Sequence, residues 1–454
     1  MKNWLDKYFS KGMIGLLIIV CSWYGKNLDT WGKNKVIDND VVSYYAYLPA
    51  GLIFHDLNFA FVKDLPPNFE GKIWLATAPN GKPVLRMTMG LAILWSPFFI
   101  LAHLAAKIIG VSALGYSWPY SLSIFVAAIF YLFLGLIFLR KILLNYFSET
   151  VTVITMLAVV LATNLMYYVI SEPGMSHVYS FSLIIIFLYA TLKWVEKPSI
   201  TYTLTIGVLA GLIVLIRPVN GLILIFPALI GIHSLADFYE RIVNRWKFIL
   251  IAGLAAILVV MPQLIYWKVQ TGQLFFNSYM DSGRFYFANP HIFDGLFSYR
   301  KGWLVYTPIM LFALFGMFFL KNYIKGIRTS IVIFLVLFLY VIFSWWCWWY
   351  GGSFGSRPMI ETYGILALPL AAFLSQLMKR SFWIKGIAST LLVFLVFFNQ
   401  FQMNQYRTSL LHWDSMTKQA YQAILFKKNW PANYDKMIKV PDYDKALKGL
   451  EEYP

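Results

Sequence analysis

Long apolar runs alternate with short polar segments over most of the chain. About 20 apolar residues are needed to cross a bilayer as a helix, and runs of this kind recur at about eleven places. The predicted spans are 9–26, 118–139, 149–170, 177–195, 201–216, 219–235, 247–266, 302–320, 329–346, 360–378 and 384–401. A transmembrane barrel would show alternating segments of roughly ten residues instead. The pattern predicts an all-α polytopic membrane protein with about eleven transmembrane helices.

A further apolar stretch at 89–109 decides the expected topology. If the N-terminus is cytoplasmic and 89–109 does not cross, the basic short loops all lie on the cytoplasmic side, as the positive-inside rule requires. These loops are 140–141, 193–197, 240–247, 321–328 and 378–385. A crossing at 89–109 would place every one of them outside. We therefore expect 89–109, which contains Pro97 and His103, to be interfacial or re-entrant.

This topology gathers most of the polar chemistry on the outer face. We expect one transmembrane domain, 1–401, whose large outer first loop, 27–117, carries interfacial helices, and a short outer-face tail, 402–454. The N-terminus has a basic stretch followed by an apolar run, as a signal peptide has. No small-residue cleavage site follows that run, so an uncleaved first helix is expected.

Composition supports the membrane assignment and narrows the partners. The chain is 59% hydrophobic and only 13% charged, with a net charge of +17. The lysines and arginines are spread through short loops between spans, which fits topology and lipid headgroups better than nucleic acid. Cys21 and Cys347 have no CxxC or metal-ligand spacing, so neither a disulfide nor a zinc site is indicated.

The first loop opens with two acidic residues, Asp38 and Asp40, followed by a tyrosine-rich stretch that includes Tyr44 and Tyr45. A carboxylate at the membrane surface suits a general base that takes a proton from a hydroxyl nucleophile. The alternative is an ordinary loop carboxylate or a helix N-cap, since a helix could begin at Asp40. His55 is a further candidate on the same expected face.

Basic residues near the outer face are candidates for binding a phosphate. Arg217 interrupts an apolar stretch, and burying a guanidinium there costs about 2.5–3.5 kcal/mol on insertion scales, so an internal carboxylate or a ligand phosphate is expected beside it. Lys82 and Arg86 could meet a headgroup-level phosphate or serve only as snorkelling anchors. Arg284 lies in the mixed loop 267–301. Glu172 and His177 flank a Pro-Gly turn and either act chemically or cap the helices.

The stretch SWWCWWYGGSFGSRPMIE, residues 344–361, combines aromatics, glycines, an arginine and a glutamate. The tryptophans predict an interface belt whose faces could also hold an isoprenoid or a sugar. The glycines allow a tight turn and close approach to a ligand. Arg357 offers a planar fork of donors suited to a phosphate, and Glu361 follows it. An aromatic anchor plus a turn would explain the tryptophans but not the arginine.

Together these motifs resemble integral-membrane glycosyltransferases of the GT-C superfamily, which include protein O-mannosyltransferases and aminoarabinose transferases. The resemblance covers most of residues 1–401 and rests on three features. These are the acidic residue after the first helix with Tyr44 four positions later, the large outer first loop ending in an apolar segment, and the late W-Y-G-G-S-F-G-x-R motif.

The resemblance implies an enzyme of the bacterial inner membrane with its active site and C-terminus on the periplasmic side. It would transfer a sugar from a polyprenyl-phosphate-linked donor to an acceptor hydroxyl of a protein, lipid or glycan. Asp40 best matches the family's base, with Asp38 in reserve, and Arg357 is the first choice for the phosphate, followed by Arg217, Arg86, Lys82 and Arg284. Many relatives carry a second acid where this chain has Val41, so no metal ligand is assigned, although a divalent metal is compatible with the family.

One base and one phosphate clamp predict direct displacement with inversion at the sugar. Two other classes remain open from the residues. An O-antigen ligase or polymerase shares the lipid-linked donor but transfers a glycan chain. A lipid or solute transporter would also have many helices, but internal repeats and broken helices would be expected in it, and no convincing repeat is present.

Overall fold

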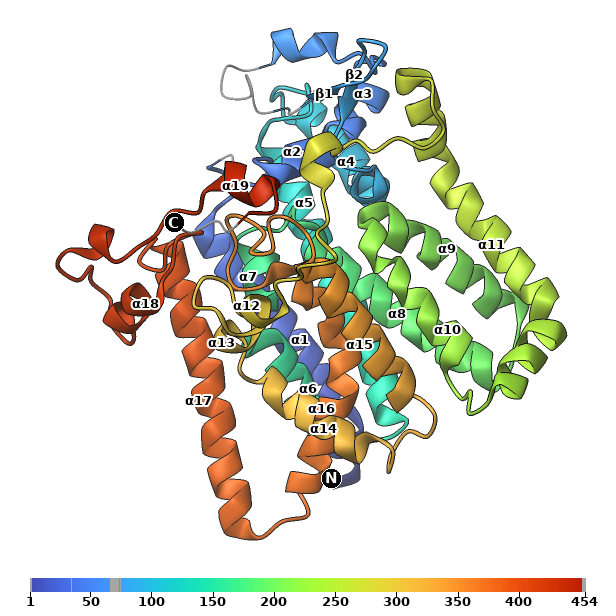
Figure 1. Cartoon of the computed structure of the whole chain (residues 1–454), viewed down its shortest axis with the longest axis vertical. Coiled ribbons are helices and arrows are strands. Elements are labelled where there is room, and N and C mark those ends of the chain that lie inside the picture. The colour runs from blue at the N-terminus through green and yellow to red at the C-terminus, as the bar shows by residue number, and fades with distance from the viewer. Residues whose placement is uncertain (1, 34, 66–72, 74, 451–454) are drawn as a thin grey trace.

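The apolar runs of the sequence fold as helices in the computed structural model, which describes residues 2–33, 35–65, 73 and 75–450. Within that part of the chain, seven helices are long and apolar enough to cross a membrane, and five shorter apolar helices accompany them. The chain is therefore an all-α polytopic membrane protein, as predicted. Figure 1 shows a helical bundle with smaller elements gathered at one end, which we call the loop end.

The first part of the chain contains α1 (Lys2–Leu28), α2 (Asp40–Tyr45), α3 (Tyr47–Leu52), η1 (Ala60–Asp64), β1 (Leu75–Thr77), β2 (Pro83–Leu85) and α4 (Gly90–Ile108). The bundle continues with α5 (Trp118–Leu144), α6 (Glu149–Leu161), α7 (Leu165–Ile170), α8 (Ser176–Glu196), α9 (Ile200–Ile216), η3 (Pro218–Leu224), α10 (Ile225–Leu229) and α11 (Leu235–Thr271).

The remaining elements are η4 (Met280–Gly283), α12 (Ile292–Phe297), α13 (Trp303–Tyr306), α14 (Met310–Leu320), α15 (Arg328–Phe343), η5 (Arg357–Thr362), α16 (Tyr363–Leu377), α17 (Phe382–Arg407), α18 (Lys418–Ile424), η6 (Tyr434–Lys436) and α19 (Tyr443–Leu447).

Local sequence signals set where several helices begin and end. Ser148 and Ser199 precede α6 and α9, and their hydroxyls accept hydrogen bonds from backbone N–H groups of the first turn. Ser234 and Asp237 form a capping box at the start of α11, and Gly272 ends that helix with φ of 78°. The 37-residue α11 therefore absorbs the predicted span 247–266 and extends well beyond it.

Helices pack closely where small residues face a neighbour. At Gly316 of α14 a Cβ would overlap the carbonyl of Pro369 in α16, and at Gly207 of α9 it would overlap that of Ala252 in α11. Small residues allow such close approach between membrane helices, where van der Waals packing drives association. These close contacts join α14 to α16 and α9 to α11.

Two predicted spans are broken, and the predicted span 219–235 ends early, since α10 stops at Leu229. The run 302–320 forms α13 and α14, with a gap at 307–309. The run 149–170 forms α6 and α7, separated at 162–164. Asn164, fully buried in the break, donates a hydrogen bond to the carbonyl of Phe354 at 2.9 Å and accepts one from the hydroxyl of Tyr363 at 2.7 Å. The interruption thus provides polar anchors for the stretch 344–361.

The first loop forms a set of short elements at the loop end of the bundle (Figure 1). The strands β1 and β2 pair antiparallel, with Leu75 opposite Leu85. By length and composition α4 could cross a membrane. In the fold, α4 packs beside the first-loop helices α2 and α3 and against the bundle, where Gly90 lies at the end of α9 and His103 hydrogen-bonds Tyr120 at the start of α5, 2.6 Å away.

The C-terminal segment 408–450 also lies at the loop end and packs on the stretch 344–361 (Figure 1). The ring of Tyr443 contacts that of Trp349, with centroids 5.4 Å apart. The hydroxyl of Tyr286 donates to the carbonyl of Leu447 at 2.6 Å. The helix before the segment, α17, runs to Arg407, a few residues beyond the expected boundary at 401.

Candidate active site

The stretch WYGGSFGSR is folded into a fixed loop that presents Arg357 at the start of η5. Its tight turns need positive φ angles at Tyr350, Gly351 and Gly355. At Gly355 a Cβ would lie 3.0 Å from Cβ of Tyr306, so there is little room for a side chain. The backbone N–H of Phe354 donates to the hydroxyl of Tyr168 at 3.1 Å, which fixes the segment leading to Arg357.

Two of the four tryptophans of this stretch contradict the expected interface belt, whereas Trp345 and Trp346 are partly exposed. Trp348 and Trp349 are almost fully buried. The guanidinium carbon of Arg300 lies 5.0 Å from the ring centroid of Trp349 and 6.0 Å from that of Trp348. An indole enclosed by protein and stacked on a cation cannot also face lipid, so these two rings support the loop from inside.

Arg357 meets Asp40, a residue 317 positions earlier in the chain. A guanidinium nitrogen of Arg357 donates to Oδ2 of Asp40 at 3.2 Å. The two side chains are 14% and 25% exposed, so the pair borders accessible space. Among the described residues, none accepts a hydrogen bond from the buried Nε of Arg357. The arginine therefore keeps donor capacity for a further anion.

A second ion-paired cluster lies four positions further along η5. Oε1 of Glu361 is 3.4 Å from Nε of Arg217 and 3.2 Å from Nδ1 of His177. Glu361 and His177 are each only 1% exposed, and Arg217 is 18% exposed. The internal carboxylate expected beside Arg217 is therefore Glu361. Oε2 of Glu361 and Nε2 of His177 have no hydrogen-bond partner among the described residues.

Tyrosines fill the space between the two clusters. Tyr44 lies one helical turn after Asp40 in α2, which places both on the same side of that helix. Burial raises the pKa of the Tyr44 phenol, while the charge of Arg217 opposes that shift. The guanidinium of Arg217 also lies over the ring of Tyr350, 5.6 Å from its centroid. The phenol of Tyr279 lies in the electric field of Asp40, Arg217 and Arg357.

Two further ionisable groups, the partly buried Glu172 and the buried Lys301, lie near Arg357. Glu172 accepts a hydrogen bond from the hydroxyl of Tyr167 at 2.8 Å, and burial raises its pKa despite the nearby charge of Arg357. Lys301 is 1% exposed, and its ammonium donates to the carbonyl of Ser353. Burial lowers the pKa of Lys301 to about 7, against the opposing effect of Asp414.

The structure thus brings together seven of the residues proposed from the sequence: Asp40, Tyr44, Glu172, His177, Arg217, Arg357 and Glu361. They come from α2 in the first loop, the turn before α8 and its first turn, the end of α9, and η5. Helix ends and loops carry the whole set, while the long helices hold these ends in place.

Other proposed residues lie outside this cluster. Oδ1 of Asp38 accepts from the backbone N–H of Asn39 at 3.0 Å. The hydroxyl of Tyr45 donates to the carbonyl of Gly115, and its ring packs against α4, so it is part of the core. His55 is exposed in the loop after α3. Lys82 is exposed, and its ammonium donates to the carbonyl of Val269 at 3.4 Å.

Two arginines occupy the border of the site. The carbonyl of Arg86 accepts from the hydroxyl of Ser278, at 2.6 Å, and its Nε is buried without a hydrogen-bond partner among the described residues. Its neighbour Met87 contacts the hydroxyl of Tyr279 through sulfur at 2.7 Å. The side chain of Arg284 is exposed, and its carbonyl accepts from the backbone N–H of Trp346.

Sequence reasoning did not select Lys301, Tyr279 or Tyr350 as site residues. All three stand in segments that the hydropathy pattern identifies as loops, where charged and aromatic residues are common. The signal that could have singled out Lys301 is its position in an Arg-Lys-Gly-Trp sequence immediately before α13. Its burial depends on tertiary packing under Ser353.

The residues around Asp40 do not form a metal-ligand set. No group of three or more His, Cys, Asp or Glu side chains that could hold a metal ion occurs among the residues with described positions. The carboxylate of Asp40 faces the guanidinium of Arg357 rather than further acidic ligands. We therefore assign no residue to a metal.

The fold of the chain is similar to that of a known protein. No protein-family model and no curated protein matches the chain. Among solved structures, the archaeal oligosaccharyltransferase AglB from Archaeoglobus fulgidus, in complex with an inhibitory peptide and a dolichol-phosphate, aligns with a TM-score of 0.50. The chain shares the fold of this oligosaccharyltransferase.

The alignment with AglB covers 99% of this chain and 60% of AglB, at 13% sequence identity. The chain thus spans about three fifths of the length of AglB. Nearly the whole chain takes part in the alignment, and the likeness is one of fold.

Proposed function

We propose that the protein is a membrane glycosyltransferase that moves a sugar from a polyprenyl-phosphate-linked donor to an acceptor hydroxyl. The observation that carries the proposal is the pairing of Asp40 with Arg357. A carboxylate and a phosphate-binding fork are the two groups that such a transfer needs, and they meet at the loop end of a fold shared with an oligosaccharyltransferase.

In the proposed reaction, Asp40 takes the proton of the acceptor hydroxyl as its oxygen attacks the anomeric carbon of the donor. The bond from that carbon to the phosphate oxygen breaks, and the polyprenyl phosphate leaves with the electron pair. Arg357 donates hydrogen bonds to the oxygens on which charge builds. Attack opposite the leaving group inverts the anomeric configuration.

The pairing in the ligand-free protein suggests how the base becomes available. Arg357 donates to Asp40 through one terminal nitrogen, while its Nε keeps a donor for another acceptor. A donor phosphate would compete with Asp40 for the guanidinium and release the carboxylate toward the acceptor. Arg217, held by Glu361 beside Tyr350, is the second cation within the site and would add positive charge near the phosphate.

The expected setting is the bacterial inner membrane, with the N-terminus cytoplasmic and the loop end periplasmic. The dolichol-phosphate named with AglB is a polyprenyl-type lipid phosphate, which supports a donor of that class here. The acceptor would be a protein, a lipid or a glycan. The short C-terminal segment packs directly on the stretch 344–361, where the ring of Tyr443 contacts that of Trp349.

A second candidate follows from the name of the structural neighbour. AglB is an oligosaccharyltransferase, so a transferase of preassembled glycans, of the ligase or polymerase kind, is an alternative on the same chemistry. The two differ in the donor: a single sugar on a monophosphate against a glycan chain on a lipid.

The test is sugar release or transfer by the purified protein from a panel of polyprenyl-phosphate sugars, with Asp40→Asn alongside. Release by the wild type and loss in the variant supports the proposal and identifies the donor. Lipid-linked oligosaccharides form the second arm, and turnover only in that arm favours the glycan transferase. No turnover with either class by folded protein rejects the glycosyltransferase.

A further inference from the structure

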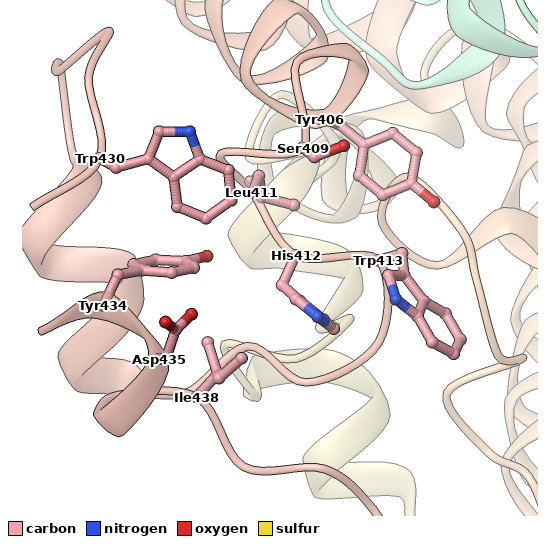
Figure 2. Close-up of a pocket in the computed structure, with 9 residues that line it drawn as sticks. All are labelled: Tyr406, Ser409, Leu411, His412, Trp413, Trp430, Tyr434, Asp435 and Ile438. Carbon is pink, nitrogen blue, oxygen red and sulfur yellow. The ribbon is translucent and has the colours of Figure 1, made fainter.

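A separate cavity of about 270 Å³ lies within the C-terminal segment (Figure 2). Trp430 and Tyr434 stand on one side of it, and Tyr406 and Trp413 stand on the other, with His412 between them. Pockets for drug-sized ligands hold roughly 300–1,000 Å³, so this cavity suits a single small unit rather than a lipid chain.

The aromatic walls present flat apolar faces. The indoles of Trp413 and Trp430 are 52% and 54% exposed, although the chain has a large core in which such rings could be buried. Trp430 is braced edge-on by the buried Tyr434, with centroids 4.8 Å apart, and Trp413 lies against His412 at 5.7 Å. Braced but accessible indoles are suited to stacking a ligand, because little side-chain entropy remains to be lost.

His412 and Asp435 are two of the polar residues that line the cavity, beside Ser409. Nδ1 of His412 accepts the backbone N–H groups of Asp414 and Ser415 at 3.3 and 3.0 Å. Amide N–H groups can only donate, so the ring proton is assigned to Nε2, the nitrogen that is left to meet a ligand, while Nδ1 also lies 3.4 Å from Oδ1 of Asp414. The exposed carboxylate of Asp435 offers acceptors at the edge of the cavity.

This combination favours a sugar ring over an organic cation. A cage of tryptophan, tyrosine and carboxylate would also attract a quaternary ammonium group. An N–H donor inside the cage opposes a cation, but it matches a hydroxyl group, as the carboxylate does. A hexose has an apolar face of C–H groups for the indoles and a rim of hydroxyls for His412 and Asp435.

The cavity adjoins the candidate active site through Tyr406. The ring of Tyr406 contacts that of Tyr167, with centroids 5.3 Å apart, and Tyr167 donates to Glu172. The ammonium of Lys301 lies 5.2 Å from the centroid of the same ring. One side chain thus separates the cavity from the charged residues around Arg357.

We propose that this cavity binds one hexose unit of a saccharide, and, resting on the proposed function, that the saccharide is the acceptor glycan. Stacking on Trp430 and Trp413 would hold the ring, and His412 and Asp435 would select its hydroxyls. The acceptor class of the enzyme would then be a glycan or glycolipid rather than an unmodified protein.

The test measures saccharide binding by the full-length protein in nanodiscs, which avoids sugar-based detergents. Methyl hexosides and linear trisaccharides are the saccharide probes, and tetramethylammonium is the cation probe. Binding is measured by saturation-transfer NMR and calorimetry. Trp430→Ala should weaken saccharide binding about tenfold, the loss of one aromatic contact. Trp383→Ala, which removes a 78% exposed indole at the start of α17, is the matched control and should bind as the wild type does.

Saccharide binding that is lost in Trp430→Ala, weakened in Asp435→Asn and retained in Trp383→Ala supports the site. Absence of saccharide binding, equal binding by Trp430→Ala, or binding of tetramethylammonium in place of sugars overturns it. Asp40→Asn separates the two proposals. If that variant keeps full turnover while Trp430→Ala loses saccharide binding, the proposed base is wrong and the saccharide site stands.

Discussion

Two ion-paired clusters each include a residue of the same short helix, η5, and their side chains differ in how far they are buried. Arg357 meets Asp40 where both side chains remain partly exposed, at 14% and 25%. Glu361, four positions later, meets Arg217 and His177 with only 1% of its own side chain exposed. The first pair can exchange its partner for a ligand, while the second is enclosed and fixes the site in place.

The energetic consequence of this difference is a separation of roles. Partly exposed ion pairs contribute about 0–1 kcal/mol to stability, so the Asp40–Arg357 pair can open easily. Removing one partner of a buried pair costs about 3–5 kcal/mol, because the other charge is left uncompensated. Variants of the two acids should therefore affect different properties, activity for Asp40 and stability for Glu361.

The largest expected effect is on turnover in Asp40→Asn. Loss of a general base lowers the rate by about 10²–10⁴-fold. Because the pair with Arg357 is partly exposed, the melting temperature should change little, and donor binding should be largely retained. Sugar release and thermal unfolding measured on one preparation check both statements. Normal turnover would remove Asp40 from the mechanism.

Glu361→Ala should act in the opposite way. It leaves Arg217 without its buried carboxylate and is expected to lower the free energy of unfolding by about 3–5 kcal/mol. Glu196→Ala is the matched control, since Glu196 pairs with Lys193 at 2.8 Å on the surface, where such pairs contribute about 0–1 kcal/mol. Thermal unfolding in nanodiscs compares the two. Equal melting temperatures would mean that the Glu361 cluster does not hold the fold.

The sequence predicts the bundle well because hydropathy depends only on the length and apolarity of a segment. It cannot place the break at Asn164, since that break is stabilised by Phe354 and Tyr363 from distant parts of the chain. The same limit explains Trp348 and Trp349. Their spacing suits a membrane belt, and only the packing of Arg300 against them shows that they face inward.

The candidate site could likewise be predicted only in part from the sequence. Residue type and position next to a span were enough to propose Asp40, Arg217 and Arg357. The contact between Asp40 and Arg357 joins residues 317 positions apart, which no local pattern can predict. Lys301 shows the reverse case: its burial, which depends on the fold alone, gives it a property that its loop sequence does not suggest.

Arg357→Lys tests the partly exposed pair of Asp40 and Arg357. Lysine keeps the positive charge but lacks the planar fork, so donor binding should weaken by the value of a charged hydrogen bond, about 10–150-fold. Arg380→Lys, which changes an exposed arginine in the turn between α16 and α17, is the control and should stay close to the wild type. Titration with a polyprenyl-phosphate sugar measures both. Equal weakening in the two variants would mean that the guanidinium fork of Arg357 has no specific part in donor binding.

Lys301 is buried near the partly exposed Asp40–Arg357 pair, so its contribution to stability should depend on pH. Its pKa is lowered to about 7 in the folded protein against 10.5 for an ordinary lysine, so the unfolded chain binds more protons between these values. The contribution of Lys301 to stability therefore rises with pH from about 7 to 10. Lys301→Met should be most stabilising, relative to the wild type, below pH 7, and this advantage should shrink as pH rises.

Melting temperatures of the wild type and of Lys301→Met across pH 6–10 check this sign. Lys82→Met, which changes an exposed lysine, is the control and should differ less from the wild type at every pH. A constant offset between Lys301→Met and the wild type would show that Lys301 does not change its protonation across this range.

The smallest expected effect is that of Asp38→Asn, which separates the two acids of the first loop. Asp38 lies two positions before Asp40, but its Oδ1 accepts from the backbone N–H of Asn39 at 3.0 Å, whereas Asp40 faces Arg357. An asparagine keeps that acceptor, so turnover should change by less than about threefold, below 1 kcal/mol. Sugar release by Asp38→Asn beside Asp40→Asn measures the difference. Comparable losses in both would assign the base to a carboxylate pair, because neighbouring acids that share a proton act as one unit.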